Sequence, residues 1–258
     1  MRLRQVALIA RELAPVAKAL EAVFGLKVAF RDPGVGVFGL ANVVMPVGGE
    51  FLEVLEPIAE GASGARYLAR RGGDAGYMVI LQDDDALAHR ARLEAAGVRV
   101  IAASRGERYR YTHFHPADCA GVLLSIDEVA GADWREAKGD WPPAGPDWRA
   151  FASGESLGVA SITVQARDPA AAARRWSELL ERPVRRDGEA PTLDLDLGAI
   201  RFVRPIDEDG TGVVGLDVVV RHVEAALARA RDAALEVRAG AVIICGTAIR
   251  PVMAPLVA

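Results

Sequence analysis

Apolar positions along the chain recur with a period of two in some stretches and of three to four in others, and this order repeats four times. Each repeat opens with a strand-like run, at residues 3–9, 77–81, 158–164 and 213–220. A stripe of apolar residues at helical spacing follows each run, and further strand-like runs close the repeat. The repetition predicts four βαβββ modules in an α+β fold. A single module would leave the apolar face of its sheet exposed, so we expect the modules to pair.

The first and third repeats show the boundaries most clearly. An apolar stripe from Leu13 to Phe24 predicts an amphipathic helix that ends at Gly25. In the third repeat, Asp168 is the expected N-cap and Pro169 the first helical residue. The fourth repeat is expected to be trimmed at its end. After the first helix the pattern predicts strands at residues 27–30, 35–40, 42–46 and 51–55.

Between the second and third repeats the composition changes to Pro, Gly and charged residues. This stretch predicts a linker at residues 131–155 between a first domain, 1–130, and a second domain, 156–258. Pro residues within it exclude a continuous helix, so a coiled coil is not expected. Three Trp residues seven positions apart are expected to hold the linker on a domain surface: Trp134, Trp141 and Trp148.

Composition restricts the class of partner. The formal net charge is -4 and no block of Lys or Arg is present, which argues against nucleic acid or an anionic membrane as the partner. No apolar run approaches the roughly 18 residues that span a bilayer, and no signal peptide is evident, so a cytoplasmic protein is expected. Cys119 and Cys245 lack the spacing of a disulfide framework or a thiolate zinc site. A small molecule is therefore the expected partner, with a homodimer as a further option.

A strand ending in two histidines is the strongest candidate for a ligand-contacting surface. Its alternation places Tyr109, Tyr111, His113 and His115 on one face, and Pro116 then ends the strand. A face with this many polar and aromatic groups is typical of a cleft wall. The alternative is a half-solvated edge strand. The apolar return strand, residues 122–126, is expected in the core.

Three stretches resemble the vicinal oxygen chelate superfamily, which includes glyoxalase I, methylmalonyl-CoA epimerase, bleomycin-resistance proteins and extradiol dioxygenases. They are RQVALIARELAPVAKALEAVFGL at the start, FLEVLEP at the end of the first repeat, and FHPADCAGVLLSID, which is similar to the epimerase-type HP turn followed by a GVL strand. The resemblance covers nearly the whole chain outside the linker. It implies two glyoxalase-like domains, each with a curved mixed sheet that forms a cleft.

In the metal enzymes of that superfamily, four ligands come from the first and last strands of paired modules. The resemblance places Gln5, Glu53, Tyr77 and Ser125 at these positions. Gln and Glu fit the family pattern, whereas neutral Tyr and Ser are poor ligands for a divalent cation. The resemblance therefore predicts a degenerate metal site and no metal. The alternatives are a Mn, Ni, Zn or Fe ion at this site, or a displaced site that uses His113 and His115.

The matching positions in the second half form no such ligand set. They are Ser161, Arg201 and Leu216. We therefore expect the second half to be structural.

Two classes of function follow for the first half. Glu53 lies in an apolar strand, so burial would raise its pKa and suit it to act as a base; an ion-paired or strand-edge Glu is the alternative. The favoured function is small-molecule binding without turnover. The alternative is a metal-dependent lyase, isomerase or dioxygenase acting on a small oxygenated substrate. The predicted catalytic residues are Glu53, Tyr77 and His113, and the predicted ligand-binding residues are Gln5, Tyr111, His115 and Ser125.

Overall fold

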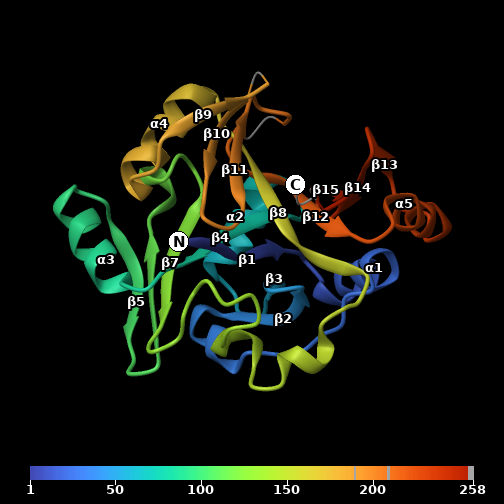
Figure 1. Cartoon of the computed structure of the whole chain (residues 1–258), viewed down its shortest axis with the longest axis horizontal. Helices are drawn as coiled ribbons and strands as arrows, with labels where there is room; N and C mark the ends of the chain where they lie inside the picture. Colours follow the sequence, from blue (N-terminus) through green and yellow to red (C-terminus); the bar gives the residue numbers. More distant parts are fainter. Residues whose placement is uncertain (189, 208–209, 255–258) are drawn as a thin grey trace.

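The computed structural model describes residues 1–188, 190–207 and 210–254, and its strands form two mixed sheets, one from each half of the chain (Figure 1). The first sheet has seven strands in the order β2-β3-β1-β4-β7-β6-β5. The second has eight, in the order β13-β14-β15-β12-β8-β11-β10-β9. The predicted α+β class with two mixed sheets is confirmed.

The first half contains two modules. The first comprises β1 (Arg2–Ile9), α1 (Leu13–Phe24), the 3-10 helix η1 (Pro33–Phe38), β2 (Leu40–Val47), β3 (Glu50–Pro57) and α2 (Ser63–Arg71). The second comprises β4 (Ala75–Gln82), α3 (Ala86–Ala95), β5 (Val100–Arg105), β6 (Tyr109–Phe114), the 3-10 helix η2 (Pro116–Asp118) and β7 (Leu123–Val129).

The two modules of the first half pair at the centre of one sheet. Within each module the first and last strands are parallel, β1 with β3 and β4 with β7, because a helix crosses between them. β1 and β4 are antiparallel and join the modules. Pairing therefore takes place within the chain.

The first module departs from the prediction at two of its four expected strands. Of residues 27–30, only Phe30 pairs, in an isolated bridge with Val44. Residues 35–40 were predicted as a strand, but most of them lie in η1. Pro33 at the start of η1 has a fixed φ and no N–H, and Asp32 caps the helix by accepting a bond from Gly34 N. Helix α2 was not predicted.

The second half repeats the βαβββ order twice. Its first module comprises β8 (Ser156–Gln165), α4 (Pro169–Leu180), β9 (Val184–Asp187), β10 (Ala190–Asp194) and β11 (Ala199–Val203). Its second comprises β12 (Gly212–Val220), α5 (Val223–Asp232), β13 (Val237–Arg238), β14 (Ala241–Ile244) and β15 (Thr247–Val252). The predicted cap is confirmed, since Asp168 accepts a hydrogen bond from Ala171 N and Pro169 begins α4.

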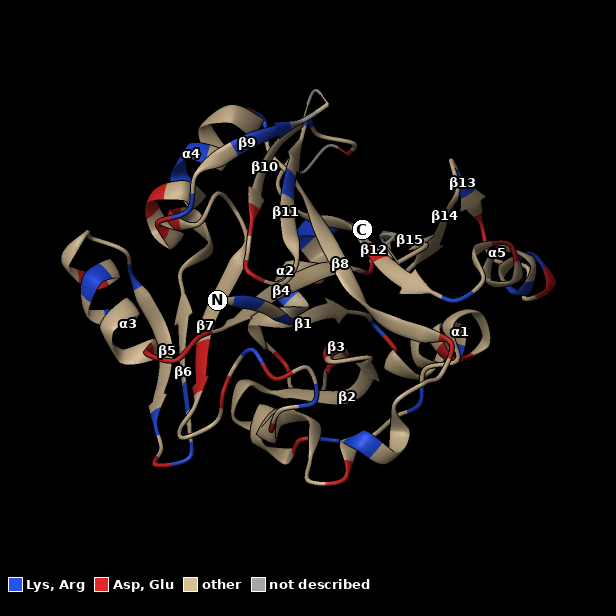
Figure 2. Cartoon of the chain, in the orientation of Figure 1, with Lys and Arg blue, Asp and Glu red and all other residues tan. Residues whose placement is uncertain are grey.

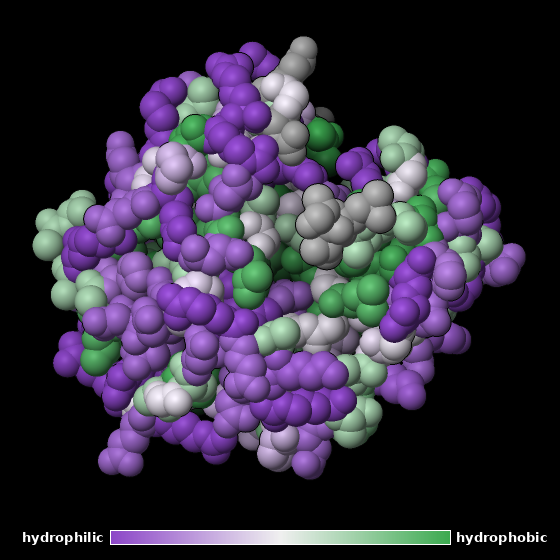
Figure 3. Space-filling model, viewed as in Figure 1, coloured by the Kyte–Doolittle hydropathy of each residue, from purple (hydrophilic) through white to green (hydrophobic). Residues whose placement is uncertain are grey.

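The two halves pack closely against each other. One core cluster contains buried residues of both, such as Leu8 of β1 and Leu216 of β12. Gly246 approaches the first half so closely that a Cβ built on it would lie 2.0 Å from the carbonyl oxygen of Asp74. On the face shown in Figure 3, hydrophilic residues cover most of the surface.

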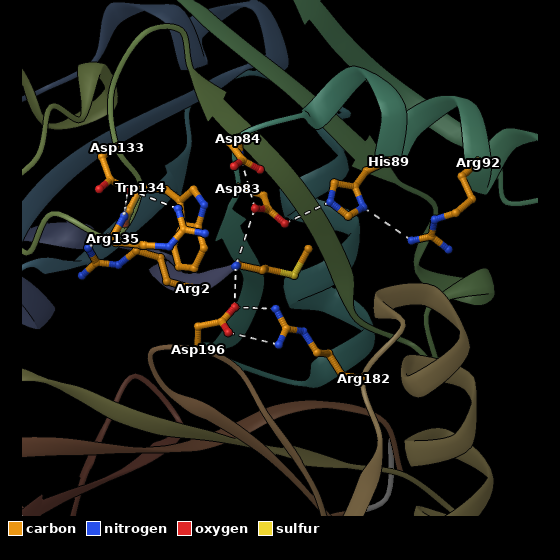
Figure 4. Close-up of polar contacts among 11 residues, drawn as sticks. Arg2, Asp83, Asp84, His89, Arg92, Asp133, Trp134, Arg135, Arg182 and Asp196 are labelled. Carbon is orange, nitrogen blue, oxygen red and sulfur yellow. Dashed lines mark hydrogen bonds and ion pairs between the residues drawn. The ribbon is translucent and has the colours of Figure 1, made fainter.

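Polar contacts also cross between the halves. The guanidinium of Arg92 on α3 donates to the carbonyl oxygen of Leu179 on α4, at 2.6 Å. Figure 4 shows His89 between Asp83 and Arg92, and the ring Nε2 of His89 lies 3.0 Å from a carboxylate oxygen of Asp83. The bond from Arg92 to Leu179 holds α3 against the second half.

The linker packs into the interior of the first half. Its three Trp residues are all buried, and Trp141 and Trp148 belong to a cluster with Phe51 of β3 and Met78 of β4. The ring of Trp148 meets that of Phe51 edge-on, with 4.9 Å between their centroids. Trp148 begins the short 3-10 helix η4 (Trp148–Phe151), and Trp141 immediately precedes another, η3 (Pro142–Ala144). The linker thus covers one face of the first sheet. In the described ranges, no helix combines the length and the apolar character needed to cross a membrane.

Candidate ligand-binding site

A cavity of about 490 Å³ lies against the first sheet. All of the residues that line it fall between positions 5 and 143, so the first half and the linker form it alone. Five of the seven predicted site residues are among them: Gln5, Glu53, Tyr77, Tyr111 and His113. The volume is within the range of sites that bind small organic molecules.

Glu53 of β3 is the buried acid at one wall of the cavity. It is only 5% exposed. One carboxylate oxygen accepts a hydrogen bond from Gln5 Nε2 at 2.8 Å, and the other accepts one from Asn42 Nδ2 at 2.6 Å. Burial raises the pKa of Glu53, and the two amide bonds act in the opposite direction. The carboxyl group is therefore held by neutral donors and has an enhanced affinity for a proton.

Both amides are held in a single orientation. The indole Nε1–H of Trp141 donates to Gln5 Oε1 at 2.7 Å, and the backbone N–H of Asp32 donates to Asn42 Oδ1 at 2.8 Å. Neither N–H group can accept a hydrogen bond, so each amide must turn its NH2 group toward Glu53. A residue of the linker thereby orients a side chain of the first strand.

Asp127 of β7 is a second buried acid in the same cavity, and sequence reasoning missed it. It accepts hydrogen bonds from the hydroxyl groups of Tyr109 and Ser125. Burial raises its pKa to about 7, although both hydrogen bonds act in the opposite direction. Asp127 belongs to the acidic stretch of β7 visible in Figure 2. Extending the predicted strand by one residue would have shown that Asp127 alternates onto the same face as Ser125.

A bulge in β4 turns Tyr77 toward the cavity. The register between β1 and β4 changes from Ala7 opposite Met78 to Leu8 opposite Gly76, which leaves Tyr77 as the extra residue. Tyr77 and Met78 therefore both line the cavity, although they are neighbours in a strand. Burial raises the pKa of the Tyr77 hydroxyl, so it remains neutral at physiological pH.

His113 lies between two other rings of the cavity wall. Its ring centroid is 4.7 Å from that of Tyr111 and 5.9 Å from that of Phe38. Burial lowers its pKa to about 4, so the imidazole is neutral near pH 7. Within the described ranges, no side chain or backbone group forms a hydrogen bond with this imidazole. Its nitrogen atoms are available to a ligand.

Two predicted ligand-binding residues are not among those that line the cavity. Ser125 is fully buried, and its hydroxyl lies against Asp127 and the carbonyl oxygen of Thr112. His115 follows the last residue of β6, and its Nδ1 accepts a hydrogen bond from Ala117 N at 3.2 Å. Ser125 donates a hydrogen bond to Asp127, and His115 caps the turn that Pro116 begins.

Gln5, Glu53 and Ser125, which occupy three of the four family positions, form hydrogen bonds with other protein groups. Both Glu53 oxygens accept amide hydrogens, and the one oxygen of Gln5 accepts the indole hydrogen of Trp141. Ser125 directs its hydroxyl to Asp127, and the Tyr77 hydroxyl stays protonated. Among the described residues, no group of three or more His, Cys, Asp or Glu side chains is arranged to hold a metal ion.

The corresponding positions of the second half form a separate polar cluster. Ser161 donates to Asp217 at 2.9 Å, and Arg201 forms an ion pair with the same carboxylate. Leu216 is buried. None of these residues lines the cavity.

A family model described as a glyoxalase-like domain matches residues 6–180, from β1 through the linker to the end of α4. No curated protein sequence matches.

Among solved structures, methylmalonyl-CoA epimerase from Mycobacterium tuberculosis is 24% identical, with a TM-score of 0.45, over 50% of this chain and 88% of that one. A variant of the Streptomyces coelicolor epimerase in complex with 2-nitronate-propionyl-CoA is 24% identical, with a TM-score of 0.46, over 51% and 99%. A hypothetical protein from Bacillus halodurans is 19% identical, with a TM-score of 0.44, over 49% and 93%.

Proposed function

The chain belongs to the family of glyoxalase-like domains, as its motifs predicted, and we propose that it binds a small organic molecule in the first-half cavity without a metal ion. The hydrogen bonding of Glu53 carries this proposal. Both of its oxygens, and the oxygen of Gln5, already accept hydrogens at the positions where the family's metal enzymes have ligands. Recruiting a metal would break these buried bonds and leave the Trp141 indole N–H unpaired.

The rest of the cavity supports binding through hydrogen bonds and apolar contact. Leu55, Met78, Ile80 and Leu123 contribute apolar surface, and the neutral imidazole of His113 offers a donor and an acceptor. A mainly apolar wall with a few convergent polar groups is typical of small-molecule sites. The cytoplasmic location and the homodimer expected from the sequence remain predictions.

Metal titration tests the metal-free part of the proposal. Purified protein should be treated with chelator and titrated with Mn, Ni, Zn and Fe salts in a calorimeter, beside Glu53→Gln. We expect no binding at one equivalent per chain with micromolar affinity. One-equivalent binding that Glu53→Gln abolishes would show that the metal-dependent alternative is correct.

A ligand screen tests binding itself. Ligand-observed NMR on mixtures of small organic molecules should find compounds whose binding is lost in Ala102→Trp, because Ala102 is a half-buried lining residue and Trp would fill the cavity. Arg201→Ala, which alters only the second half, should retain them. If every bound compound persists in Ala102→Trp, the cavity is not the binding site.

A second candidate function is proton transfer on the bound molecule. It is favoured by one observation, that burial raises the pKa of two carboxyl groups, Glu53 and Asp127, that line the same cavity. A general base is most effective when its pKa is near the working pH. A bound carbonyl compound should then exchange its acidic C–H for deuterium in D2O, and Glu53→Gln should abolish exchange while binding persists. Exchange at the uncatalysed rate with all ligands found would leave binding as the function.

A further inference from the structure

The charges on the cavity wall are all of one sign. Among the described residues, three carboxyl groups line it, those of Asp32, Glu53 and Asp127, and no Lys or Arg does. The side chains that donate to Glu53 are amides, and those that donate to Asp127 are hydroxyl groups. The two buried acids are thus solvated by neutral dipoles rather than paired with a cation.

Arg4, a buried cation near the cavity, interacts with groups outside it. Arg4 of β1 lies beyond the cavity wall, with its guanidinium 5.2 Å from the Phe51 ring centroid and 5.3 Å from that of Trp141. It donates to the carbonyl oxygens of Gly49 at 2.6 Å and Gly139 at 2.7 Å. Its role is to hold the linker on the sheet. The two buried acids therefore have no paired cation and face a molecule in the cavity.

Aromatic side chains form another part of the cavity wall. Phe38, Tyr77, Tyr109, Tyr111 and His113 all line the cavity. The faces of such rings attract cations, by roughly 0.5–2 kcal/mol each depending on desolvation. The imidazole of His113 is half-buried, neutral and without a hydrogen-bond partner among the described residues, so it can accept a hydrogen from a ligand N–H group.

We propose that the cavity is specific for cationic ligands, namely an amine in its protonated form carried on an apolar or aromatic body. The proposal rests on the proposed binding function and names its ligand class. A cation in the cavity gains attraction from the buried carboxylates and the ring faces at short range and low dielectric. An anion of the same shape meets like charge there, without a Lys or Arg in the lining to offset its loss of hydration. Apolar residues, Leu55 and Ile80 among them, accommodate the body of the ligand.

Three probes with one carbon framework separate charge from shape. They are phenethylamine, which is protonated at pH 8, neutral phenethyl alcohol, and anionic phenylacetate. Dissociation constants should be measured by NMR titration and calorimetry. We expect the amine to bind at least about tenfold more tightly than the alcohol, which corresponds to about 1.4 kcal/mol. Phenylacetate should bind most weakly.

The preference should also depend on pH. The titratable groups facing the cavity are the three carboxyl groups, three tyrosines and His113. Burial raises the pKa values of all three tyrosines and lowers that of His113 to about 4, so these four groups stay neutral between pH 5 and pH 8. Burial raises the pKa of Asp127 to about 7, so its charge appears within this range. The preference for amine over alcohol should therefore grow from pH 5 to pH 8.

Variants identify the groups responsible. Asp127→Asn and Glu53→Gln should each reduce the amine preference severalfold, and Asp127→Asn should also flatten its pH dependence. Glu128→Gln is the matched control, because Glu128 is the next residue of β7 and pairs with Arg110 at 2.7 Å rather than lining the cavity. Circular dichroism should establish that each variant is folded.

Failure of this inference differs from failure of the proposed function. If the alcohol or phenylacetate binds as tightly as the amine, or if the amine preference is unchanged in both acid variants, the cation specificity is wrong and small-molecule binding stands. The same holds if none of the three probes binds while uncharged compounds of the screen bind in a manner lost in Ala102→Trp. If nothing of any charge binds in that manner, the proposed function itself is wrong.

Discussion

Trp141 donates its indole N–H to the amide oxygen of Gln5 at 2.7 Å, across a sequence separation of 136 residues. This bond leaves the Gln5 NH2 group facing Glu53, which it reaches at 2.8 Å. The linker is therefore part of the site. It determines which end of an amide faces the buried acid, and Pro143 of the same segment lines the cavity.

Replacing Trp141 with Phe should destabilise the fold more than the same change at Trp148. Both residues are buried against the first sheet, and both variants lose the same ring area. Trp141 donates a hydrogen bond, whereas the indole nitrogen of Trp148 has no partner in the part of the chain that the structure describes. Trp141→Phe leaves the Gln5 oxygen unpaired, so its extra cost in free energy of unfolding should be about 1–3 kcal/mol in urea denaturation. Equal losses in the two variants would show that the bond contributes nothing.

The contribution of Asp127 to stability should decrease as pH rises. Burial raises its pKa from 3.8 to about 7, so between these values the unfolded chain ionises this group before the folded chain does. Its contribution is complete below about pH 4 and is lost as pH rises through about 7. Relative to the wild type, Asp127→Asn should therefore gain on the order of 3 kcal/mol in free energy of unfolding between pH 4 and pH 8. Denaturation series at several pH values measure this, and a constant difference would contradict the raised pKa.

Arg201→Ala should leave ligand affinity unchanged to within about threefold, roughly 0.7 kcal/mol. Arg201 pairs with Asp217 in the second sheet, and only residues of the first half and linker line the cavity. Affinity of the variant for any ligand of the screen measures this. A hundredfold loss would mean that the second half contributes directly to the site.

Gly246→Ala should destabilise the contact between the halves much more than Gly240→Ala. Both glycines have a left-handed backbone, with φ of 61° and 75°, so the intrinsic strain of substitution is similar. A Cβ at Gly246 would lie 2.0 Å from Asp74 O, whereas nothing lies within 4 Å of one at Gly240. We expect an additional loss of about 2 kcal/mol or more in free energy of unfolding at Gly246. Similar losses in the two variants would show that disrupting the contact between the halves does not lower the free energy of unfolding.

The sequence predicted those parts of the fold that depend on local patterns. Asp168 and Pro169 start a helix because the cap and the fixed φ act within one turn. The pattern failed around Val37, which is apolar and suits a strand, yet is 81% exposed in a 3-10 helix. Pro33 and the cap of Asp32 outweigh alternation there, because they act on the backbone directly.

In the candidate site, too, the sequence predicted some residues and missed others. The family resemblance implied that five residues would face one cavity: Gln5, Glu53, Tyr77, His113 and Ser125. The first four line it and Ser125 does not. The sequence did not distinguish Asp127 from other acidic residues as a site residue, because its raised pKa depends on burial by residues from several strands. The bulge that turns Tyr77 inward is likewise a property of strand pairing.

The sequence alone determined four modules and two mixed sheets, because hydrophobic periodicity encodes which faces must be buried. The family resemblance implied which half carries the cavity. The tertiary structure decided which polar and charged groups face the cavity. The orientation of Gln5 depends on an N–H group 136 positions away, and the charge of the wall depends on which acids lie there without a basic partner. Such contacts join residues that are remote in sequence, and a hydrogen bond or ion pair forms only where folding places donor and acceptor within about 3 Å.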